Sequence, residues 1–425
     1  QPYYNYQILL ECAGPNTDRI RRALGQALRA NPQLMAKFGV DSTGRFTQTF
    51  PISAIDMDEI SIHEVASAQE AREICWMKAA VPFNLEEGPA IAVDEIRING
   101  YSTWFVLTMN EILIDGWGAM KFMEQLISLF KCRNMDDQEI EVKTAMTSVL
   151  EYFQHLSKPK EISAEARKFW SKSLDGVKSC FPLRDTLNNS CDPYAASVIE
   201  VSLDDEATAE IRSTAHALST SPFAVFVAAY SLALAAVSDQ HDFVVGAPVA
   251  GRNDEYEIGV PTLMLNMIAI RTRIDVEKKI SDTVRSMISN VTEAVSFGDS
   301  VFSKVVSEFA DHTNEDPLFS TMVNMLTYPS LEFWDGDRSL HLTELNTGFT
   351  KYDASLYIQR HGEDYTLQLA YKVAYVTPER ANKVLALTAW FLTSDWLSGK
   401  TTVANAIKTA LNDCDTSQIT MLKSY

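Results

Sequence analysis

Two adjacent polar residues, Asn110 and Glu111, interrupt an apolar stretch in which residues 103–109 predict a buried strand. Neighbouring side chains of a strand point to opposite faces, so in a sheet covered on both faces they cannot both avoid the interior. A buried carboxylate is costly unless it is paired or protonated. We therefore expect Glu111 to be paired, protonated or facing a water-filled channel, unless the strand simply ends here at the surface.

The chemistry open to these residues follows from their types. Glu111 could act as a general base if burial raised its pKa, but it could donate a hydrogen bond only when protonated. Asn110 could donate through its amide but cannot exchange protons. Asp115 precedes Gly116 at the start of a predicted helix, where a carboxylate caps free backbone N–H groups. Gly116 and Trp117 are expected to shape the same turn.

The predicted elements around this stretch alternate between strands and helices. The clearest is a hairpin of strands 90–98 and 101–109 that turns through Asn99-Gly100. Upstream we predict a strand, a helix, a hairpin and a second helix. Downstream we predict a helix, a loop and two helices divided around Lys158-Pro159-Lys160. The upstream ranges are 4–12 (strand), 19–30 (helix), 39–50 (hairpin) and 64–80 (helix), and the downstream ranges are 116–130 (helix), 131–141 (loop) and 146–174 (helices).

A second set of elements follows residues 175–194, which have no sustained period and contain Gly176, Pro182 and Pro193. We predict a strand at 196–203 and helices at 204–218 and 222–237. Strands and helices thus alternate in both halves, which indicates an α/β protein with two domains.

Composition restricts the function further. The chain has 425 residues with 56 acidic and 37 basic side chains, a formal net charge of -19. This charge argues against nucleic acid as a partner. No apolar run has the length of a membrane span, so we expect a cytoplasmic protein without membrane contact. Six scattered cysteines and seven scattered histidines give no zinc-type spacing, and no glycine-rich phosphate loop follows a strand. We therefore expect neither a metal nor a nucleotide cofactor.

The segment Asn110-Glu111-x-x-x-Asp115-Gly116 resembles the His-His-x-x-x-Asp-Gly motif of nonribosomal peptide synthetase condensation domains, with both histidines replaced. Other segments resemble landmarks of that family in the same order along the chain. They are Pro82-Phe83-Asn84-Leu85 with Gly88-Pro89, Gly246-Ala247-Pro248-Val249-Ala250-Gly251-Arg252, Leu265-Asn266 through Arg271, Asp316-Pro317-Leu318-Phe319 and Tyr352-Asp353-Ala354-Ser355-Leu356. The chain departs from the family at Met35, where an arginine is usual. If the arginine that holds the motif aspartate came from there, Asp115 would lack its partner.

The resemblance implies two chloramphenicol-acetyltransferase-like lobes arranged as a V around a central cleft. The expected division is an N-terminal lobe at 1–175 carrying the motif, a linker at 176–195 and a C-terminal lobe at 196–425. Arg252 and Asn266 would line the cleft or latch the lobes. The competing interpretation, which we favour slightly, is a buried arginine paired with an acid of a lobe. Substrates would arrive on the phosphopantetheine arms of carrier proteins, with no other cofactor. The chain would be a monomer or part of a multidomain synthetase.

Two hypotheses remain open. The first is an acyl or aminoacyl transferase in which Glu111 stands where the family's catalytic histidine is, assisted by Asn110. The second is a catalytically silent domain that binds carrier proteins and recruits a tailoring enzyme. We favour the transferase here, because an ionisable residue inside an apolar strand is costly and would not be expected to arise by drift.

Overall fold

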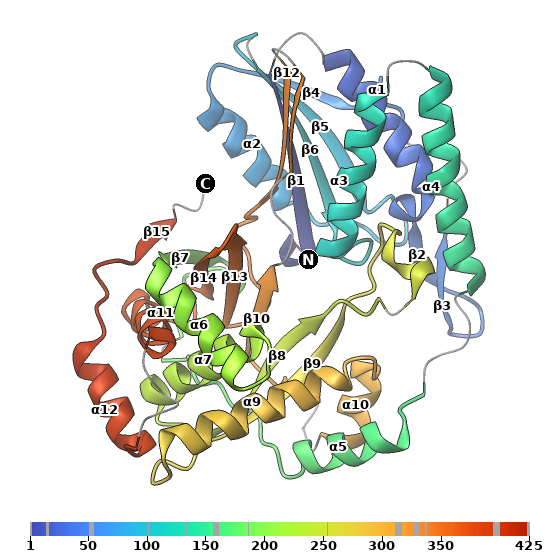
Figure 1. Cartoon of the computed structure of the whole chain (residues 1–425). Helices are drawn as coiled ribbons and strands as arrows, with labels where there is room; N and C mark the ends of the chain where they lie inside the picture. The colour runs from blue at the N-terminus through green and yellow to red at the C-terminus, as the bar shows by residue number, and fades with distance from the viewer. Residues whose placement is uncertain are drawn as a thin grey trace.

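The computed structural model describes the chain apart from residues 1, 14–16, 51–54, 101, 133–134, 156–160, 186, 253, 311–316, 327–330, 336–337, 394–399 and 423–425. In Figure 1 the two large sheets occupy separate halves of the molecule, at upper right and lower left. The chain enters near the centre of the view, between them. We call the first sheet with its helices the N-terminal lobe, and the second sheet with its helices the C-terminal lobe.

The sheet of the N-terminal lobe is mixed: β4 runs parallel to β5, and the other pairs are antiparallel. Across it the strands are, in order, β11 (Leu331–Asp335), β12 (Arg338–Leu345), β1 (Asn5–Ala13), β6 (Ser102–Asn110), β5 (Ile91–Ile98) and β4 (Ser61–Val65). A separate hairpin pairs β2 (Lys37–Val40) with β3 (Phe46–Thr49). Strand β6, which ends at Asn110, lies between β1 and β5 in the interior of the sheet.

Helices cover both faces of this sheet, with α2 on one side and α1, α3 and α4 on the other (Figure 1). Their bounds are α1 (Thr17–Ala30), α2 (Ala68–Ala79), α3 (Gly116–Lys131) and α4 (Met135–His155), with short 3-10 turns at Pro2–Tyr4 and Pro32–Met35. Leu24 of α1 and Phe122 of α3 are fully buried with Leu107 of β6 in one core. On the other face Cys75 of α2 packs with Trp104 and Val106. The strand that precedes the motif is therefore buried on both sides, as its apolar run predicts.

The sheet of the C-terminal lobe is also mixed, with β10 parallel to both β8 and β13. Its strands are, in order, β15 (Thr420–Leu422), β7 (Ala196–Ser202), β14 (Asp364–Lys372), β13 (Ala354–His361), β10 (Thr321–Leu326), β8 (Asp242–Val249) and β9 (Asn266–Arg273). Its helices are α5 (Ala164–Leu174), α6 (Asp205–Ala217), α7 (Pro222–Ser238), α8 (Glu255–Ile258), α9 (Ile280–Ser296), α10 (Phe302–Phe309), α11 (Pro378–Thr393) and α12 (Val403–Asp413). One large core joins this sheet to its helices, with α7 almost entirely inside it.

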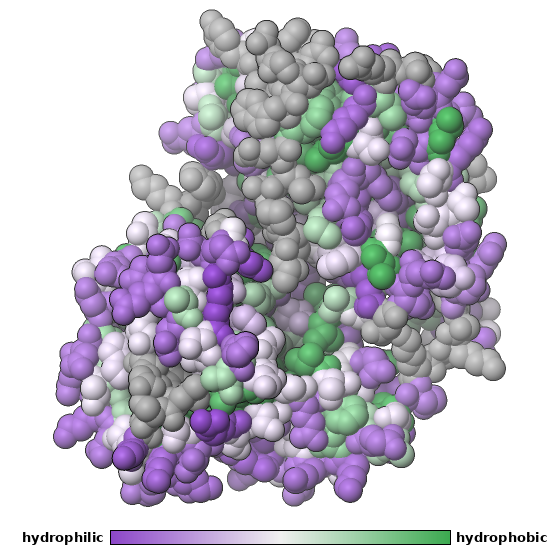
Figure 2. Space-filling model, in the orientation of Figure 1, coloured by the Kyte–Doolittle hydropathy of each residue, from purple (hydrophilic) through white to green (hydrophobic). Residues whose placement is uncertain are grey.

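No single helix in the described ranges is both long and apolar enough to cross a membrane. Helices α6 and α7 have the length and apolar composition of a membrane span only when taken together, and the chain bends by 109° between them. Figure 2 shows hydrophilic residues over most of one face of the molecule, with a small hydrophobic group near its centre, between the two lobes.

Each lobe contains elements from both halves of the sequence, so the lobes do not correspond to two consecutive segments of the chain. Strands β11 and β12 come from the second half of the sequence, and β12 pairs with β1 along its length from Ser339 to Leu345. Conversely, Trp170 of α5 is buried in the core of the C-terminal lobe. Each lobe is therefore completed by residues from the other side of the 176–195 segment.

Most predicted elements are confirmed. Asn99 and Gly100 lie in the connection between β5 and β6 and have left-handed φ values of 46° and 72°. Ile98 pairs with Ser102, so the connection is one position longer than the two-residue turn that the sequence predicts. The loop predicted at 131–141 is wrong, because α4 begins at Met135. The charged residues of its first turns are exposed, whereas Gln138 is buried and donates to the Leu129 carbonyl at 3.2 Å. Strand β4 was not predicted as a strand. The break at Lys158-Pro159-Lys160 and the landmark residue Asp316 lie outside the described residues.

Candidate functional site

Asn110 is the last residue of β6 and closes the turn that follows it. Its side chain is buried, at 7% exposed, and its Oδ1 accepts a hydrogen bond of 3.1 Å from the backbone N–H of Ile112. Its backbone N–H donates to Ala90, and its carbonyl accepts from Leu113. The amide oxygen is therefore committed to the turn that carries Glu111.

Glu111 lies just beyond the strand, in that turn. Its side chain is 36% exposed, and its carboxylate accepts a hydrogen bond from the ammonium of Lys351, which is 31% exposed. The Lys351 ammonium also lies 4.8 Å from the centre of the Tyr4 ring, and the backbone N–H of Glu111 donates to the Tyr4 carbonyl at 2.7 Å. Among the expected environments for Glu111, the structure shows a paired carboxylate where the strand ends. The premise that it sits inside an apolar strand is wrong.

The negative charge of Glu111 raises the pKa of two tyrosines of the C-terminal lobe. Burial raises the pKa of Tyr352 to about 12, and the negative charge of Glu111 adds to the shift. Burial and Glu111 also raise the pKa of Tyr357 above its ordinary value. Both phenols are therefore protonated at neutral pH and can donate hydrogen bonds but not accept a proton.

Asp115 lies at the N-cap of α3, in a buried network that uses both of its oxygens. Its Oδ1 accepts from the N–H of Gly118 at 2.8 Å. Its Oδ2 accepts from the N–H groups of Met264 and Leu265 at 2.8 and 2.9 Å. The guanidinium of Arg252 donates to the two oxygens at 2.8 and 2.9 Å. Asp115 therefore binds the start of α3 to the C-terminal lobe.

The arginine that holds Asp115 comes from the C-terminal lobe. Met35, the position where the family arginine is usual, is buried in the apolar core of the N-terminal lobe. The side chains of Asp115 and Arg252 are 3% and 2% exposed, and Arg252 also donates to the Thr262 carbonyl at 2.8 Å. The motif aspartate has its charge partner, but 137 residues away along the chain.

Residues 258–265, which we call the crossing segment, run from the C-terminal lobe against the motif turn. The indole N–H of Trp117 donates to Ile258 at 2.9 Å, and the N–H of Leu263 donates to Leu113 at 3.1 Å. Gln33 donates to Pro261 at 2.8 Å. The crossing segment packs so closely that a Cβ on Gly118 would lie 2.8 Å from the carbonyl oxygen of Thr262. Trp117 and Gly118 thus fit α3, which begins at Gly116, against the other lobe.

Asn266 makes a different set of contacts. Its amide nitrogen donates to the carbonyls of Gly298 and Ser300 at 2.8 and 2.6 Å, and its oxygen accepts from Phe302 at 3.2 Å. All three contacts are within the C-terminal lobe, between the start of β9 and the connection from α9 to α10. Here Asn266 orders the C-terminal lobe, whereas Arg252 reaches the motif.

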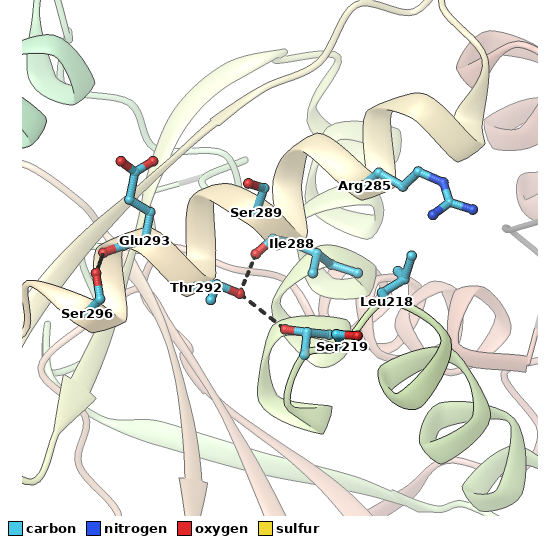
Figure 3. A pocket seen from close by; sticks show the side chains of 9 residues that line it. Leu218, Ser219, Arg285, Ile288, Ser289, Thr292, Glu293 and Ser296 are labelled. Carbon is cyan, nitrogen blue, oxygen red and sulfur yellow. Dashed lines mark hydrogen bonds between the residues drawn. The ribbon is translucent and has the colours of Figure 1, made fainter.

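An open groove of about 510 Å³ lies elsewhere on the C-terminal lobe, between α9 and the corner that joins α6 to α7 (Figure 3). Its lining is rich in hydroxyl groups, including Ser219, Ser289 and Thr292, with Arg285 and Glu293 on α9. It contains none of the predicted site residues. Within the described ranges, no group of three or more His, Cys, Asp or Glu side chains is arranged to hold a metal ion.

A model of the condensation-domain family matches residues 1–385 of the chain. Among curated proteins the chain is similar to surfactin synthase subunit 2 of Bacillus subtilis (strain 168), at 24% identity over 389 residues, 88% of this chain and 10% of that protein. It is also similar to bacitracin synthase 1 of Bacillus licheniformis, at 22% identity over 313 residues, 71% of this chain and 6% of that protein. The chain thus spans only a small part of these synthases.

Solved structures show the same fold. The condensation domain from the monacolin K polyketide synthase MokA superposes with a TM-score of 0.72 at 15% identity, covering 95% of this chain and 94% of that one. The four-domain nonribosomal peptide synthetase AB3403 gives a TM-score of 0.78 at 13% identity, covering 95% of this chain and 32% of that one. The first condensation domain of the calcium-dependent antibiotic synthetase gives 0.70 at 15% identity, covering 99% and 94%.

Proposed function

The chain belongs to the condensation-domain family, and we propose that it is a carrier-binding member that presents a thioester-bound intermediate without using Glu111 as a proton acceptor. Its partners are acyl or peptidyl carrier proteins of nonribosomal peptide biosynthesis, with substrates attached to phosphopantetheine arms. A tailoring enzyme that acts on the presented intermediate is the further partner of this proposal.

The ion pair between Glu111 and Lys351 is the observation that carries this proposal. Amide formation needs an acceptor amine close to the thioester and a group that receives or orients its proton. A carboxylate becomes a base near neutral pH when it is buried away from cations. Glu111 is instead partly exposed and bound to an ammonium, and Asn110 cannot exchange a proton. The two residues at the histidine positions are thus arranged to hold a turn and an ion pair.

The rest of the site supports a role in binding. The buried pair of Asp115 and Arg252 and the crossing segment keep the two lobes together at the motif. Binding a carrier-linked substrate requires this framework but not the proton chemistry. The contacts between the lobes and the two replaced histidines therefore support a domain that binds carrier-linked substrates without catalysing condensation.

Arg19, Arg21 and Arg22 form a basic cluster on α1, but most of this cluster is not free to bind an acidic carrier protein. Arg21 is paired with the buried carboxylate of Glu95 and is 16% exposed. Arg19 donates to the carbonyls of Lys131 and Cys132 and lies over the Phe130 ring. In this cluster only Arg22 is exposed, so the carrier surface is better sought elsewhere.

A transferase that uses Glu111 is the second candidate, and one observation favours it. The carboxylate is 36% exposed, so a substrate amine could displace Lys351 and reach it. This candidate requires that Glu111 be essential, which separates it from the first.

Intact-protein mass spectrometry of carrier proteins tests both candidates. Cognate acyl-loaded and aminoacyl-loaded carriers are incubated with wild type, Glu111→Gln and a control, Glu124→Gln, which removes a surface partner of Lys121. We expect both carriers to keep their loads with every variant, while a binding assay detects the loaded carrier. Product formed by wild type and by Glu124→Gln but reduced at least about a hundredfold in Glu111→Gln would establish the transferase instead.

A gain-of-function variant makes the test sharper. Asn110→His combined with Glu111→His and Lys351→Ala restores both histidines of the family motif and removes the cation beside them. Condensation product from this variant, with none from wild type, would show that the framework still positions substrates and that wild type lacks only the proton acceptor.

A further inference from the structure

Lys372, the last residue of β14, is a largely buried residue whose ammonium has no bonded partner among the residues that the structure describes. The residue is 7% exposed. No hydrogen bond or ion pair of its ammonium is found within the described part of the chain. The ammonium lies 4.9 Å from the centre of the Tyr194 ring and 5.6 Å from that of the Tyr375 ring. Aromatic faces attract a cation without accepting hydrogen bonds from it. The Lys372 nitrogen is not among the side-chain polar atoms shut off from solvent, so the ammonium keeps contact with water.

The nearby charges do not neutralise Lys372. The carboxylate of Asp353, which is 2% exposed, accepts two hydrogen bonds from Arg184 at 2.7 and 3.2 Å, one on each oxygen. Burial lowers the pKa of Lys372, Asp353 opposes that shift, and the guanidinium of Arg184 adds to it. Two cations therefore share one carboxylate, and an excess of positive charge remains beside the Lys372 ammonium.

Backbone hydrogen bonds fix the groups around this excess charge. The N–H of Lys372 donates to the Asp353 carbonyl at 2.9 Å, and the N–H of Val373 donates to Ala195 at 3.1 Å. The guanidinium of Arg184 stacks 4.5 Å from the centre of the Tyr375 ring, so Tyr375 lies beside both cations. The arrangement is preorganised, with two cations and two phenol rings converging from β14, the turn after it and the segment before β7.

A short series of contacts connects these cations to the motif. Tyr194 stacks on Tyr3 with ring centres 3.8 Å apart. The neighbouring Tyr4 lies beneath the Lys351 ammonium that binds Glu111. In sequence, Asp353 is two residues after Lys351. A ligand group bound at Lys372 therefore belongs to the same region as the motif turn.

We propose that Lys372 and Arg184 form an oxyanion-binding subsite that takes a phosphate or carboxylate group of a bound ligand. An oxyanion can accept hydrogen bonds from the free ammonium and neutralise the excess charge. Both a phosphopantetheine arm and an acidic acyl group carry such an oxyanion. The oxyanion subsite itself is independent of the proposed function. Only the identity of the ligand that carries the oxyanion rests on that function.

Thermal unfolding of the isolated chain tests the subsite without carrier proteins. Inorganic phosphate, phosphopantetheine and glutarate are titrated at constant ionic strength, with uncharged pantetheine as the matched control. A ligand that binds the native state raises Tm with concentration. We expect a rise with phosphopantetheine and phosphate if the oxyanion is a phosphate, or with glutarate if it is a carboxylate, and none with pantetheine.

Variants assign the effect to Lys372. In Lys372→Met the ligand concentration that gives half of the Tm rise should increase at least about tenfold, whereas Lys372→Arg should retain part of the affinity. Lys121→Met, which removes a surface lysine, should behave like wild type. Without ligand, Lys372→Met should unfold at an equal or higher temperature, because it removes a partly desolvated ammonium that no carboxylate bonds.

Two results would overturn the proposal: no oxyanion raising the Tm of wild type, or an equal rise in wild type and Lys372→Met. Failure of the proposed function is a separate result. A chain that binds phosphate through Lys372 but neither binds nor modifies loaded carriers would keep the subsite and reject the carrier role.

Discussion

Arg252 binds both carboxylate oxygens of Asp115 across the boundary between the two lobes, and the two side chains are only 2% and 3% exposed. The pair connects the start of α3 to the residues that follow β8. Because the same carboxylate also accepts three backbone N–H groups, its orientation is fixed by both lobes. Four residues of the site, Arg252, Gly118, Met264 and Leu265, therefore depend on one buried charge.

Loss of Arg252 should strongly destabilise the protein. Arg252→Met leaves Asp115 buried without its cation, and breaking a buried pair from one side costs about 3–5 kcal/mol. The free energy of unfolding, measured by urea denaturation, should fall by that amount. The control is Arg212→Met, whose partner Glu363 is 71% exposed and whose loss should change stability by less than about 1 kcal/mol. Similar losses in both variants would contradict a central role for Arg252.

The pair of Lys351 and Glu111 should contribute much less to stability. Both side chains are about one-third exposed, so solvent and salt screen their attraction. Lys351→Met should lower the free energy of unfolding by less than about 1 kcal/mol, and this small difference should shrink further at high salt. A loss as large as that of Arg252→Met would show that Lys351 holds the lobes together rather than only pairing Glu111.

Gly118→Ala should disturb the contact between α3 and the crossing segment. The added methyl group would lie 2.8 Å from the Thr262 carbonyl oxygen and 2.9 Å from its nitrogen, which are backbone atoms. Overpacking of this kind costs about 1–3 kcal/mol, measurable as a lower urea midpoint. Gly259→Ala is the matched control, since a Cβ there meets nothing within 4 Å. Equal stability of the two variants would show that the crossing segment can move away freely.

Thiol labelling should distinguish the cysteines by burial. Burial raises the pKa of Cys75 to about 12 and that of Cys180 to about 11, from 9.0. Only the thiolate reacts with iodoacetamide, so labelling of Cys180 at pH 8 should be slow and should accelerate about tenfold for each unit of pH below its pKa. Cys75, which is 4% exposed on the buried face of α2, should react only after unfolding. Peptide mass spectrometry gives both rates, and rapid native labelling of Cys75 would reveal local opening of α2.

The sequence predicted the local features of the site and missed its distant ones. Strand β6, its Asn99-Gly100 turn and helix α3 follow from apolar period and turn chemistry, which act between near neighbours. The partner of Glu111 is 240 residues away and that of Asp115 is 137 residues away. No pattern distinguishes Lys351 from other cations, and Arg252 stands out only through the family landmark in which it lies. The pairing of each with its acid depends on how the two sheets pack.

The same limit explains the error about Glu111. The strand and the turn after it are both rich in apolar residues, since Ile112, Leu113 and Ile114 follow Glu111. Leu113 and Ile114 are buried in the structure. The sequence therefore indicated a continuous interior, whereas the backbone turns at Asn110 and brings Glu111 to a partly exposed position. The environment of Glu111 depends on where the chain reverses direction. The apolar periodicity of the sequence around it does not show that position.

The exchange of β11 and β12 has a consequence for how this protein is made. Until residue 345 has left the ribosome, β1 lacks its neighbour on one side, and an unpaired strand in a large sheet invites association with other chains. Folding of the first half during translation must therefore wait for more than a hundred later residues, a span from 196 to 345 that also has its own core to form. A nascent chain that pauses within this span would be most dependent on chaperones, and cutting the gene between the two halves should yield aggregated fragments rather than two separate domains.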